Sequence, residues 1–409
     1  MTATVDAPRK APEAIASPPA ATTAAPTTPA RRFACLDGYR AIAALSVVVY
    51  HVMGRLSIHT NQETLGLYSS RLGNFGVTVF FLLSGFLLYR PFALAHLRGD
   101  RSPDMARFYK RRLLRIIPGY WLALTVLLFV FQYRDVHGWG DYLTYYGFAQ
   151  VYRSGGYAIG GLGQAWSLCV EMTFYAAVPL FALLARHLWW GQAPDTPARR
   201  LRSQLYLLGA LYLFAVVFRW WALQHIDIVP TATSWLPGLT DLFALGMLLA
   251  VASAWVEQGG QLPSVVDWLV ARPWLCWLFA AQTYWALAMV HLPRAWETET
   301  MGQAMDKPII TGICAMFLLL PGTLGPERSR GIAAVLRSRP LAGLGVISYG
   351  IYLWHTQWIE LYLNMRDSGQ IANGFWIMLG FVMILTLASS MASYYLVERP
   401  FLRQFWRRP

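Results

Sequence analysis

Apolar stretches recur along most of the chain, and short polar segments separate them. A helix needs about 20 predominantly apolar residues to cross a bilayer, so each stretch predicts a membrane-spanning helix. Because backbone groups inside a bilayer must be hydrogen-bonded within the protein, the pattern predicts an all-α polytopic fold with about ten transmembrane helices. The first two spans flank a polar loop, expected at residues 57–74. The spans are expected at residues 38–52, 76–95, 113–131, 165–185, 205–221, 236–255, 274–290, 309–324, 341–363 and 375–396.

The N-terminal segment differs in composition from the rest of the chain. Residues 1–32 are rich in Pro, Ala and Thr and contain almost no large apolar side chains. Such a segment cannot bury enough surface to offset the entropy of ordering it. It also lacks the apolar core of a signal peptide. We therefore predict a disordered cytoplasmic tail at residues 1–32 and one transmembrane domain at residues 33–409.

The charged residues are few, and their positions matter more than their sum. The chain is 56% hydrophobic and 13% charged, whereas charged residues make up about a quarter of soluble globular proteins. A formal net charge of +13 would suggest nucleic-acid binding in a soluble protein, but no nucleic-acid partner is expected for a membrane protein of this pattern. Most of the 34 Lys and Arg residues lie in the tail, the C-terminus and alternate loops. The positive-inside rule then places both termini in the cytoplasm, with an even number of spans.

The cysteines are widely spaced single residues, at Cys35, Cys169, Cys276 and Cys314. Their spacing matches neither a metal-binding motif nor a disulfide framework. We expect them to be small apolar residues of the core, and we expect no metal site.

One Arg and one His interrupt the first apolar span. Arg40 and His51 are eleven residues apart, which at about 100° per residue places both on one face of the helix, about 16 Å apart along its axis. A titratable side chain inside hydrocarbon is costly unless it faces the bundle interior or an aqueous cavity. The pair is therefore a candidate functional site, with Arg40 near the cytoplasmic edge and His51 deep in the membrane.

Other polar residues can be assigned a depth by counting about 1.5 Å per residue from the predicted ends of the spans. Glu171 in the fourth span and His355 in the ninth fall at about the level of His51. Asp241 in the sixth span lies slightly nearer the outside. The count thus predicts a layer of titratable groups on three helices, formed by His51, Glu171 and His355.

Three arginines in the pattern R-R-x-x-R lie at the start of the third span, at Arg111, Arg112 and Arg115. With Arg40 they form a cluster at the cytoplasmic edge that can bind phosphates bidentately. An acyl-CoA fits this layout, because its phosphates would lie at the basic rim while its pantetheine arm carries the thioester inward to His51. His51 would act as the general base on an incoming hydroxyl, and Glu171 would orient its imidazole.

Each assignment has an alternative. The arginines are also what the positive-inside rule places at helix ends, and Glu171 and His355 are also candidates for structural hydrogen bonds between helices. A proton-coupled transporter or flippase of a lipid or glycan would use ionisable residues inside the membrane as well. The sequence shows no obvious internal repeat in favour of a transporter. A membrane scaffold without chemistry would leave the layer around His51 unexplained.

Several motifs follow one another along nearly the whole chain after the tail. They are LDGYRAIAALSVVVYH, GVTVFFLLSGFLL, RRLLRIIPGYWLAL, AWSLCVEMTFYAAVPL, DLFALGMLLA, SYGIYLWHTQW and YLVERPFL. Taken together and in this order, they resemble the motifs of the acyltransferase 3 family of integral-membrane O-acyltransferases. The resemblance implies that Arg40 and His51 are the essential pair, and that the R-R-x-x-R arginines and Glu171 are further functional residues. The motif W-S-L-x-V-E also covers Trp166 and Ser167, which we add to the candidates.

The same resemblance implies a reaction. Members of the family are understood to take acyl groups from cytoplasmic acyl-CoA and place them on hydroxyls of extracytoplasmic glycans, lipids or secondary metabolites. We expect a bacterial inner-membrane O-acyltransferase with acetyl-CoA as cosubstrate, no bound cofactor, and a glycan or glycolipid of the cell envelope as acceptor. Some members carry a second acyltransferase domain of the SGNH type. Because this sequence ends at Pro409, we expect the membrane domain to complete transfer alone or with a separate partner, either directly or through an acyl-enzyme.

Overall fold

The computed structural model describes residue 2 and residues 33–406, except 73–74, 132–135, 137, 159, 189–194, 226, 228–230, 290–299 and 326–330. The tail predicted at residues 1–32 lies, apart from residue 2, outside the described residues.

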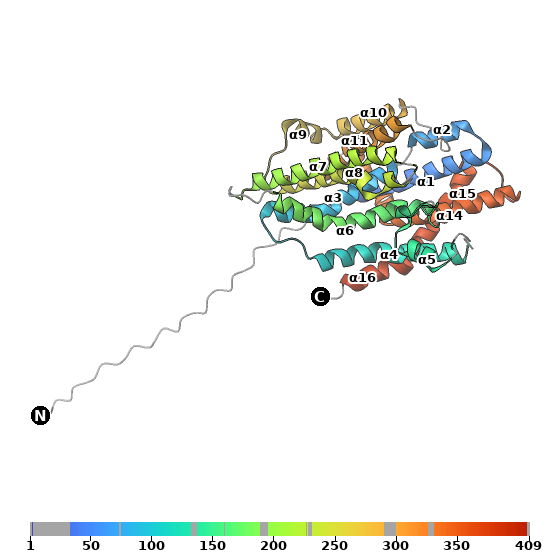
Figure 1. The fold of residues 1–409 in the computed structure, drawn as a ribbon, viewed down its shortest axis with the longest axis horizontal. Coiled ribbons are helices and arrows are strands. Elements are labelled where there is room, and N and C mark those ends of the chain that lie inside the picture. Colours follow the sequence, from blue (N-terminus) through green and yellow to red (C-terminus); the bar gives the residue numbers. More distant parts are fainter. Residues whose placement is uncertain are drawn as a thin grey trace. The chain divides into compact units, whose positions relative to one another are not determined.

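Every regular element in the described part is a helix, and all of them belong to one compact unit, Phe33–Pro409 (Figure 1). The α-helices are α1 (Leu36–Thr60), α2 (Glu63–Leu72), α3 (Phe75–Arg98), α4 (Met105–Phe129), α5 (Trp139–Tyr146), α6 (Trp166–His187), α7 (Pro197–Gln224), α8 (Leu236–Glu257), α9 (Ser264–Val270), α10 (Pro273–Met289), α11 (Met301–Leu324), α12 (Ile332–Leu336), α13 (Arg339–Val346), α14 (Ser348–Asp367), α15 (Phe375–Ser393) and α16 (Arg399–Trp406). Three short 3-10 helices lie at Gln150–Tyr152, Gly163–Ala165 and Ala232–Ser234, and a π-helical turn, Tyr394–Glu398, joins α15 to α16.

The all-α polytopic fold is confirmed, although fewer helices than predicted meet the requirements for a membrane span. Among the described residues, eight helices are long and apolar enough to cross a bilayer. A ninth is obtained if α9 and α10, which are bent by 97° relative to each other, form one broken span. All ten predicted stretches do contain a helix, but α14 is not among the eight. Its second half carries Glu360, Arg366 and Asp367, which lower its apolarity.

The first span is longer than predicted. The apolar pattern placed it at residues 38–52, but α1 continues to Thr60. The polar loop expected at residues 57–74 is likewise wrong, because it contains the last turn of α1 and the whole of α2. Leu56 and Ser57 are buried beyond the predicted end, so packing against neighbouring helices stabilises polar turns that hydropathy alone would leave outside. His51 therefore lies well inside the helix.

The ninth predicted span, at residues 341–363, is interrupted. α13 ends at Val346 and α14 begins at Ser348, with Ile347 between them. The Ser348 hydroxyl donates a hydrogen bond of 2.8 Å to the Gly345 carbonyl oxygen at this junction. Gly345 also packs directly on α1, because a Cβ at this position would lie 2.1 Å from the Asp37 carbonyl oxygen. The break thus brings the start of α14 against the first helix.

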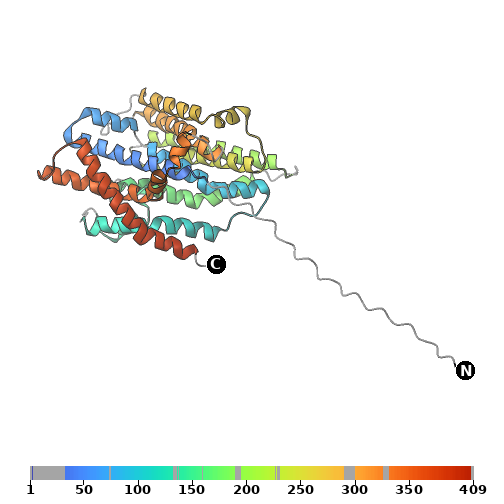
Figure 2. The same ribbon diagram turned by 180° about the vertical axis from the view of Figure 1, so that it is seen from behind.

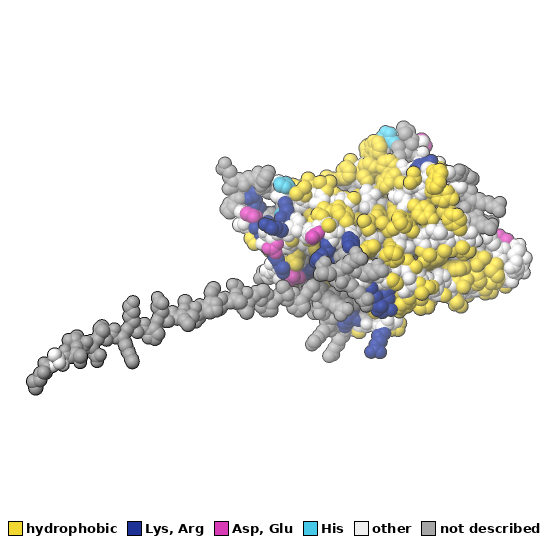
Figure 3. All heavy atoms as spheres, turned by 90° about the horizontal axis from the view of Figure 1, so that it is seen from below, with side chains coloured by type: hydrophobic (Ala, Val, Ile, Leu, Met, Phe, Trp, Pro, Cys, Tyr) yellow, Lys and Arg dark blue, Asp and Glu magenta, His cyan; other side chains and the backbone are white. Residues whose placement is uncertain are grey.

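The long helices lie side by side in alternating directions, so each end of the bundle gathers several helix ends (Figures 1 and 2). At one end α3 finishes and α4 and α7 begin, and on the face shown in Figure 3 most of the visible Lys and Arg side chains gather toward it. We call this the basic end. At the opposite end α3, α8 and α11 begin. The apolar side chains in Figure 3 cover the broad surface between the ends, as expected for a protein surrounded by lipid.

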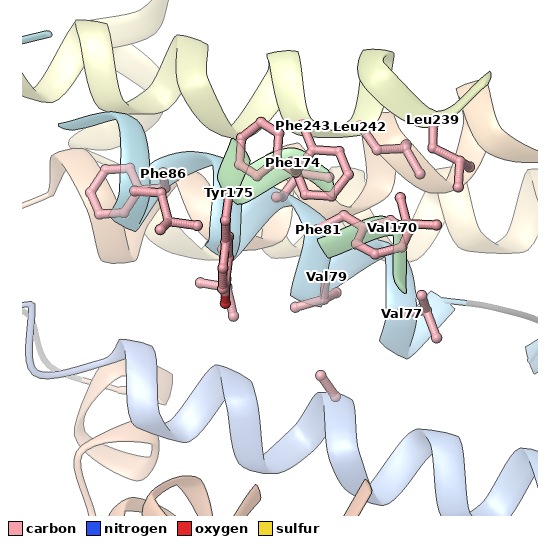
Figure 4. Close-up of a cluster of buried hydrophobic side chains, with 14 of the residues drawn as sticks. Val77, Val79, Phe81, Phe86, Val170, Phe174, Tyr175, Leu239, Leu242 and Phe243 are labelled. Carbon is pink, nitrogen blue, oxygen red and sulfur yellow. The ribbon is translucent and has the colours of Figure 1, made fainter. Parts of the chain in front are cut away.

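The closest helix packing is between α3 and α8. Cβ atoms built at Gly85 and Gly246 would lie 2.3 Å from the Phe243 carbonyl oxygen and 2.0 Å from the Leu82 carbonyl oxygen, so only glycine permits this approach. Beside this contact, the rings of Phe174 and Phe243 stack with centroids 4.0 Å apart (Figure 4). The α3–α8 contact therefore forms a rigid wall against which α6 packs.

We expect Gly246→Ala to destabilise the protein by roughly 1–3 kcal/mol, because the added methyl group forces two helix backbones apart. The matched control is Gly209→Ala in α7, where a Cβ meets nothing within 4 Å and the change is expected to be neutral or slightly stabilising. Melting temperatures of the purified variants in detergent measure the difference. Equal melting temperatures for the two variants would contradict the described α3–α8 contact.

Candidate functional site

A narrow cavity of about 80 Å³ lies between α1, α3, α4, α6 and α14. We call it the arginine cavity, after the three guanidinium groups in its wall. It brings together residues far apart in the sequence, and several of them were predicted as site residues. Its polar lining residues include Arg40 on α1, Arg112 and Arg115 on α4, Ser167 and Glu171 on α6, and Tyr352 on α14.

The R-R-x-x-R arginines do not all face this cavity. Arg112 and Arg115 line it, whereas Arg111 is exposed and is not part of the lining. The Nε of Arg112 is buried and has no hydrogen-bond acceptor among the described residues. A buried donor without a partner is uncommon and suited to binding an anion. Arg40 and Arg112 thus lie together as predicted, but Arg111 belongs to the surface.

Arg40 is the residue of α1 that lines the arginine cavity. Its side chain is 18% exposed, and its Nη1 lies 3.5 Å from a carboxylate oxygen of Asp37, one turn earlier on the same helix. The three guanidinium groups of the arginine cavity outnumber the one carboxylate in its lining, Glu171. The cavity therefore carries an excess of positive charge that favours an anionic ligand.

The structure places Glu171 in the arginine cavity, not beside His51. Its carboxylate accepts hydrogen bonds from the Ser84 hydroxyl at 2.5 Å and the Tyr175 hydroxyl at 2.8 Å. In Figure 4, Tyr175 points away from the aromatic stack of Phe174. The predicted layer of three titratable groups is therefore wrong for Glu171. His51 was counted from the cytoplasmic end of its span and Glu171 from the opposite end, and α1 continues past His51 to Thr60, so the two counts do not share one scale.

His51 and His355, which were predicted to lie at the same depth, are in direct contact. The Nδ1 of His51 lies 3.2 Å from the Nε2 of His355, across the interface of α1 and α14. The Nδ1 of His51 is also 2.9 Å from the Val47 carbonyl oxygen, and the Nδ1 of His355 is 3.1 Å from the Ile351 carbonyl oxygen. His355 is fully buried, whereas His51 is partly exposed. His355, and not Glu171, is the group that contacts the His51 imidazole.

These distances select one arrangement of protons on the two neutral rings. We assign a proton to Nδ1 of His355, which donates to Ile351, and this leaves its Nε2 as an acceptor. The Nδ1–H of His51 is then shared between Val47 and His355. The Nε2 of His51 consequently carries a lone pair that is free to accept a proton, which is the form a general base requires.

Tyr352 connects the arginine cavity to the histidine pair. Its hydroxyl donates to the Gln164 carbonyl oxygen and accepts from the Ser167 hydroxyl at 2.7 Å. Its ring lies 6.0 Å from the ring of His355, one turn further along α14. Tyr352 thus lies between the arginine cavity, which it lines, and His355, although neither histidine is itself part of the lining of that cavity.

The remaining candidates lie on the other side of α3. Asp241 pairs with Arg219 at 2.5 Å, and both side chains are almost fully buried. The ring of Trp166 packs edge-on against Phe81, with centroids 6.2 Å apart. Neither Asp241 nor Trp166 lines the arginine cavity, although Ser167 directly after Trp166 does.

Sequence reasoning did not single out Tyr352, Tyr175, Gln164 or Ser84. Two of these carry a local signal: Tyr352 lies three residues before His355, and Tyr175 four residues after Glu171, so each shares a helix face with a predicted residue. Gln164 and Ser84 carry no such signal. They reach the site only because α3 and the segment before α6 pack against α14 and α6.

Comparison with known proteins finds relatives that are named as O-acetyltransferases and as a membrane-bound transacylase. The chain is 25% identical over 339 residues to the "Peptidoglycan O-acetyltransferase OatA" of Listeria monocytogenes serovar 1/2a (strain ATCC BAA-679 / EGD-e), which covers 80% of this chain and 49% of the relative. It is 25% identical over 391 residues to the "Putative peptidoglycan O-acetyltransferase YrhL" of Bacillus subtilis (strain 168), covering 91% and 55%. It is 27% identical over 389 residues to the "Putative membrane-bound transacylase BcsY" of Komagataeibacter xylinus, covering 91% and 83%.

The chain therefore spans about half the length of the first two of these relatives. No solved structure matches it. The family model described as an acyltransferase domain matches residues 33–395, nearly the whole bundle, and the chain thus belongs to the acyltransferase 3 family.

Proposed function

We propose that this protein is a membrane O-acyltransferase that takes an acyl group from acyl-CoA bound at the arginine cavity and transfers it to a hydroxyl. The observation that carries this proposal is the place of Tyr352, which lines the cavity of three guanidinium groups and whose ring neighbours His355, the partner of His51. Membership of the acyltransferase 3 family and relatives named as O-acetyltransferases support the same reaction class.

The donor end of this path suits a coenzyme A thioester. Phosphates are recognised well by arginines, which present planar, bidentate donors. Arg112 and Arg115 project from one face of α4, and Arg40 joins them from α1, so an entering phosphate meets donors from two helices. The names of the relatives described as O-acetyltransferases support an acetyl group as the acyl group that is transferred. We therefore propose acetyl-CoA as the donor.

His51 is the proposed general base. Its Nε2 removes the proton from the acceptor hydroxyl as the oxygen attacks the thioester carbonyl carbon. A carbon–oxygen bond forms and the carbon–sulfur bond breaks. The proton held by His51 then passes to the departing CoA thiolate. No acyl-enzyme is required for this sequence of steps.

His355 is a positioning residue in this scheme. By accepting the Nδ1–H of His51, its Nε2 holds the imidazole in one tautomer and one orientation. The helix break before Ser348 and the bonds from Gln164 and Thr356 fix the turn of α14 that carries His355. In this scheme the neutral imidazole of His355 holds His51 in place, whereas the sequence predicted that the carboxylate of Glu171 would do so.

The proposed acceptor is a hydroxyl of a cell-envelope glycan or glycolipid. The names of the relatives from Listeria and Bacillus include peptidoglycan O-acetyltransferase, which supports a glycan. We further propose that the protein lies in the inner membrane of a bacterium with its basic end, and both termini, in the cytoplasm. The donor would then enter from the cytoplasm, where acyl-CoA is made.

We expect His51→Ala to lower the rate of acetyl transfer by about 100-fold or more, because it removes the general base. The assay supplies radiolabelled acetyl-CoA to inside-out membrane vesicles and counts label in the lipid and glycan fractions. Equal amounts of inserted protein, checked by detergent extraction and gel filtration, are the control. Transfer at the native rate would exclude His51 from the mechanism.

The arginine cavity predicts different effects for two neighbouring arginines. Arg112→Gln should raise the KM for acetyl-CoA about tenfold through loss of a charge-assisted phosphate contact, whereas Arg111→Gln should change it little because Arg111 lies outside the cavity. Both substitutions remove the same charge from the same helix end. Similar KM values for the two variants would indicate that these arginines do not bind acetyl-CoA and serve only to orient the protein in the membrane.

If His355 positions His51, kcat should depend on whether residue 355 can accept a hydrogen bond from the Nδ1–H of His51. His355→Leu removes the acceptor for Nδ1–H of His51 and should lower kcat about tenfold with an unchanged KM for acetyl-CoA. His355→Gln offers an amide oxygen to the same proton and should recover part of the loss. If the Leu and Gln variants have the same kcat, His355 acts only through packing.

A further inference from the structure

An ion pair joins α1 to α14 just beyond the histidine pair. Arg55 on α1 donates a hydrogen bond to the carboxylate of Glu360 on α14, and we call this pair the bridge. Arg55 follows His51 by four residues and Glu360 follows His355 by five, so the bridge lies about 6 to 8 Å further along both helices. None of the steps proposed above uses it.

The bridge lies toward the end of the bundle opposite to the basic end. The ring of Phe86 in α3 contacts Phe33, which precedes α1. Gly76, at the start of α3, packs instead on Ala43 within α1, so the two helices are antiparallel. Because α3 finishes at the basic end, α1 begins there and runs away from it. The histidine contact and the bridge follow in the same order along α1 and α14, so α14 runs in the same direction.

α3 begins before the level of the histidine pair is reached. A Cβ at Gly76, the second residue of α3, would lie 2.4 Å from the Ala43 carbonyl oxygen, which places the start of α3 level with Ala43. His51 is eight residues further along α1, or about 12 Å. The histidine pair and the bridge therefore lie in the part of the α1–α14 interface that extends past the start of α3.

Both side chains of the bridge are exposed. Those of Arg55 and Glu360 are 42% and 50% exposed, whereas those of the pair Arg219 and Asp241 are 2% and 1% exposed. Charged groups turned toward hydrocarbon are unfavourable, so the exposed side of the bridge faces water or the headgroup region. Water screens such a pair, which therefore contributes little to stability. His51 is also partly exposed, so a polar molecule at the bridge would lie next to the proposed base.

The chemistry of the bridge suits a neutral ligand that both donates and accepts hydrogen bonds. A guanidinium group carries five N–H donors, and a carboxylate accepts through two oxygens. Because the two charges cancel, the bridge does not select an anion as the arginine cavity does. A sugar hydroxyl donates one hydrogen bond and accepts others, and neighbouring hydroxyls of one sugar can use both side chains of the bridge.

We propose that Arg55 and Glu360 bind hydroxyls of a neutral sugar acceptor and hold another of its hydroxyls beside the His51 imidazole. This rests on the proposed function, since it assigns a binding site and a substrate class to the acceptor of that reaction. The donor and the acceptor then approach His51 from opposite ends of the bundle. A pair that only joined two helices would account for the contact between them. It would not account for the exposure of both charged groups one turn from the base.

The test measures sugar binding without acetyl-CoA. The full-length protein in phosphatidylcholine nanodiscs is titrated with two neutral disaccharides, maltose and N,N′-diacetylchitobiose, and binding is followed by saturation-transfer difference NMR. We expect saturable binding of at least one of them. Arg55→Met and Glu360→Leu should each raise its Kd about tenfold, because each removes a charge-assisted hydrogen bond.

Three controls separate binding from folding and from the donor site. Arg366→Met breaks another ion pair of α14, with Asp367, further from His355, and should leave the Kd for the sugar unchanged. Glu360→Gln keeps an acceptor oxygen and should recover part of the binding that Glu360→Leu loses. Acetyl-CoA binding and the melting temperature, measured on the same samples, should be the same in the native protein and in Arg55→Met.

Several outcomes would overturn the proposal. These are no saturable binding of either sugar, an unchanged Kd in both Arg55→Met and Glu360→Leu, or an equal rise in Arg366→Met. An equal loss of acetyl-CoA binding would place the bridge at the donor site instead. If nanodiscs that contain a glucosyl diacylglycerol abolish the disaccharide signal, the proposal holds with a glycolipid as the source of the hydroxyls. Because no acyl transfer enters this assay, failure of the proposed reaction would leave its result intact.

Discussion

An ionisable side chain inside an apolar bundle is stable only when it has a partner or faces a polar cavity, and this constraint organises the structure. Arg219 is buried against Asp241, His51 contacts His355, and Glu171 accepts from Ser84 and Tyr175. Each of these contacts joins two helices or two turns of one helix. The polar groups therefore fix which helix faces meet, while the apolar surface contributes most of the buried area.

The helices could largely be predicted from the sequence, but their ends could not. Apolar stretches long enough to span a bilayer identified every long helix of the described part. They failed at α1, whose last two turns contain several polar residues, of which Ser57 is buried by packing, and at the junction of α13 and α14, where Gly345 packs on α1. Hydropathy describes the preference of a segment for lipid. It contains no information on contacts made with residues hundreds of positions away.

The candidate site was predicted in parts. Helical periodicity and membrane burial identified Arg40, His51 and His355, and the first two do lie on one helix as expected. The partner of His51 was assigned wrongly, because a depth count along ideal helices cannot give the tilt and the rotation of each helix. For the same reason nothing in the R-R-x-x-R pattern distinguishes the exposed Arg111 from the lining Arg112. Pairings such as Arg219 with Asp241 depend on how neighbouring helices are rotated, and only the structure supplies that information.

The central claim is that one path carries the donor from three arginines to the free Nε2 of His51. Electron cryomicroscopy of the protein in nanodiscs with a thioether analogue of acetyl-CoA, which cannot transfer its acyl group, tests it most directly. We predict phosphate density within hydrogen-bonding distance of Arg112 and Arg40, with the acyl end beyond Tyr352 and next to His51. Phosphate density at the opposite end of the bundle, or an acyl end that lies away from the histidine pair, would contradict the account.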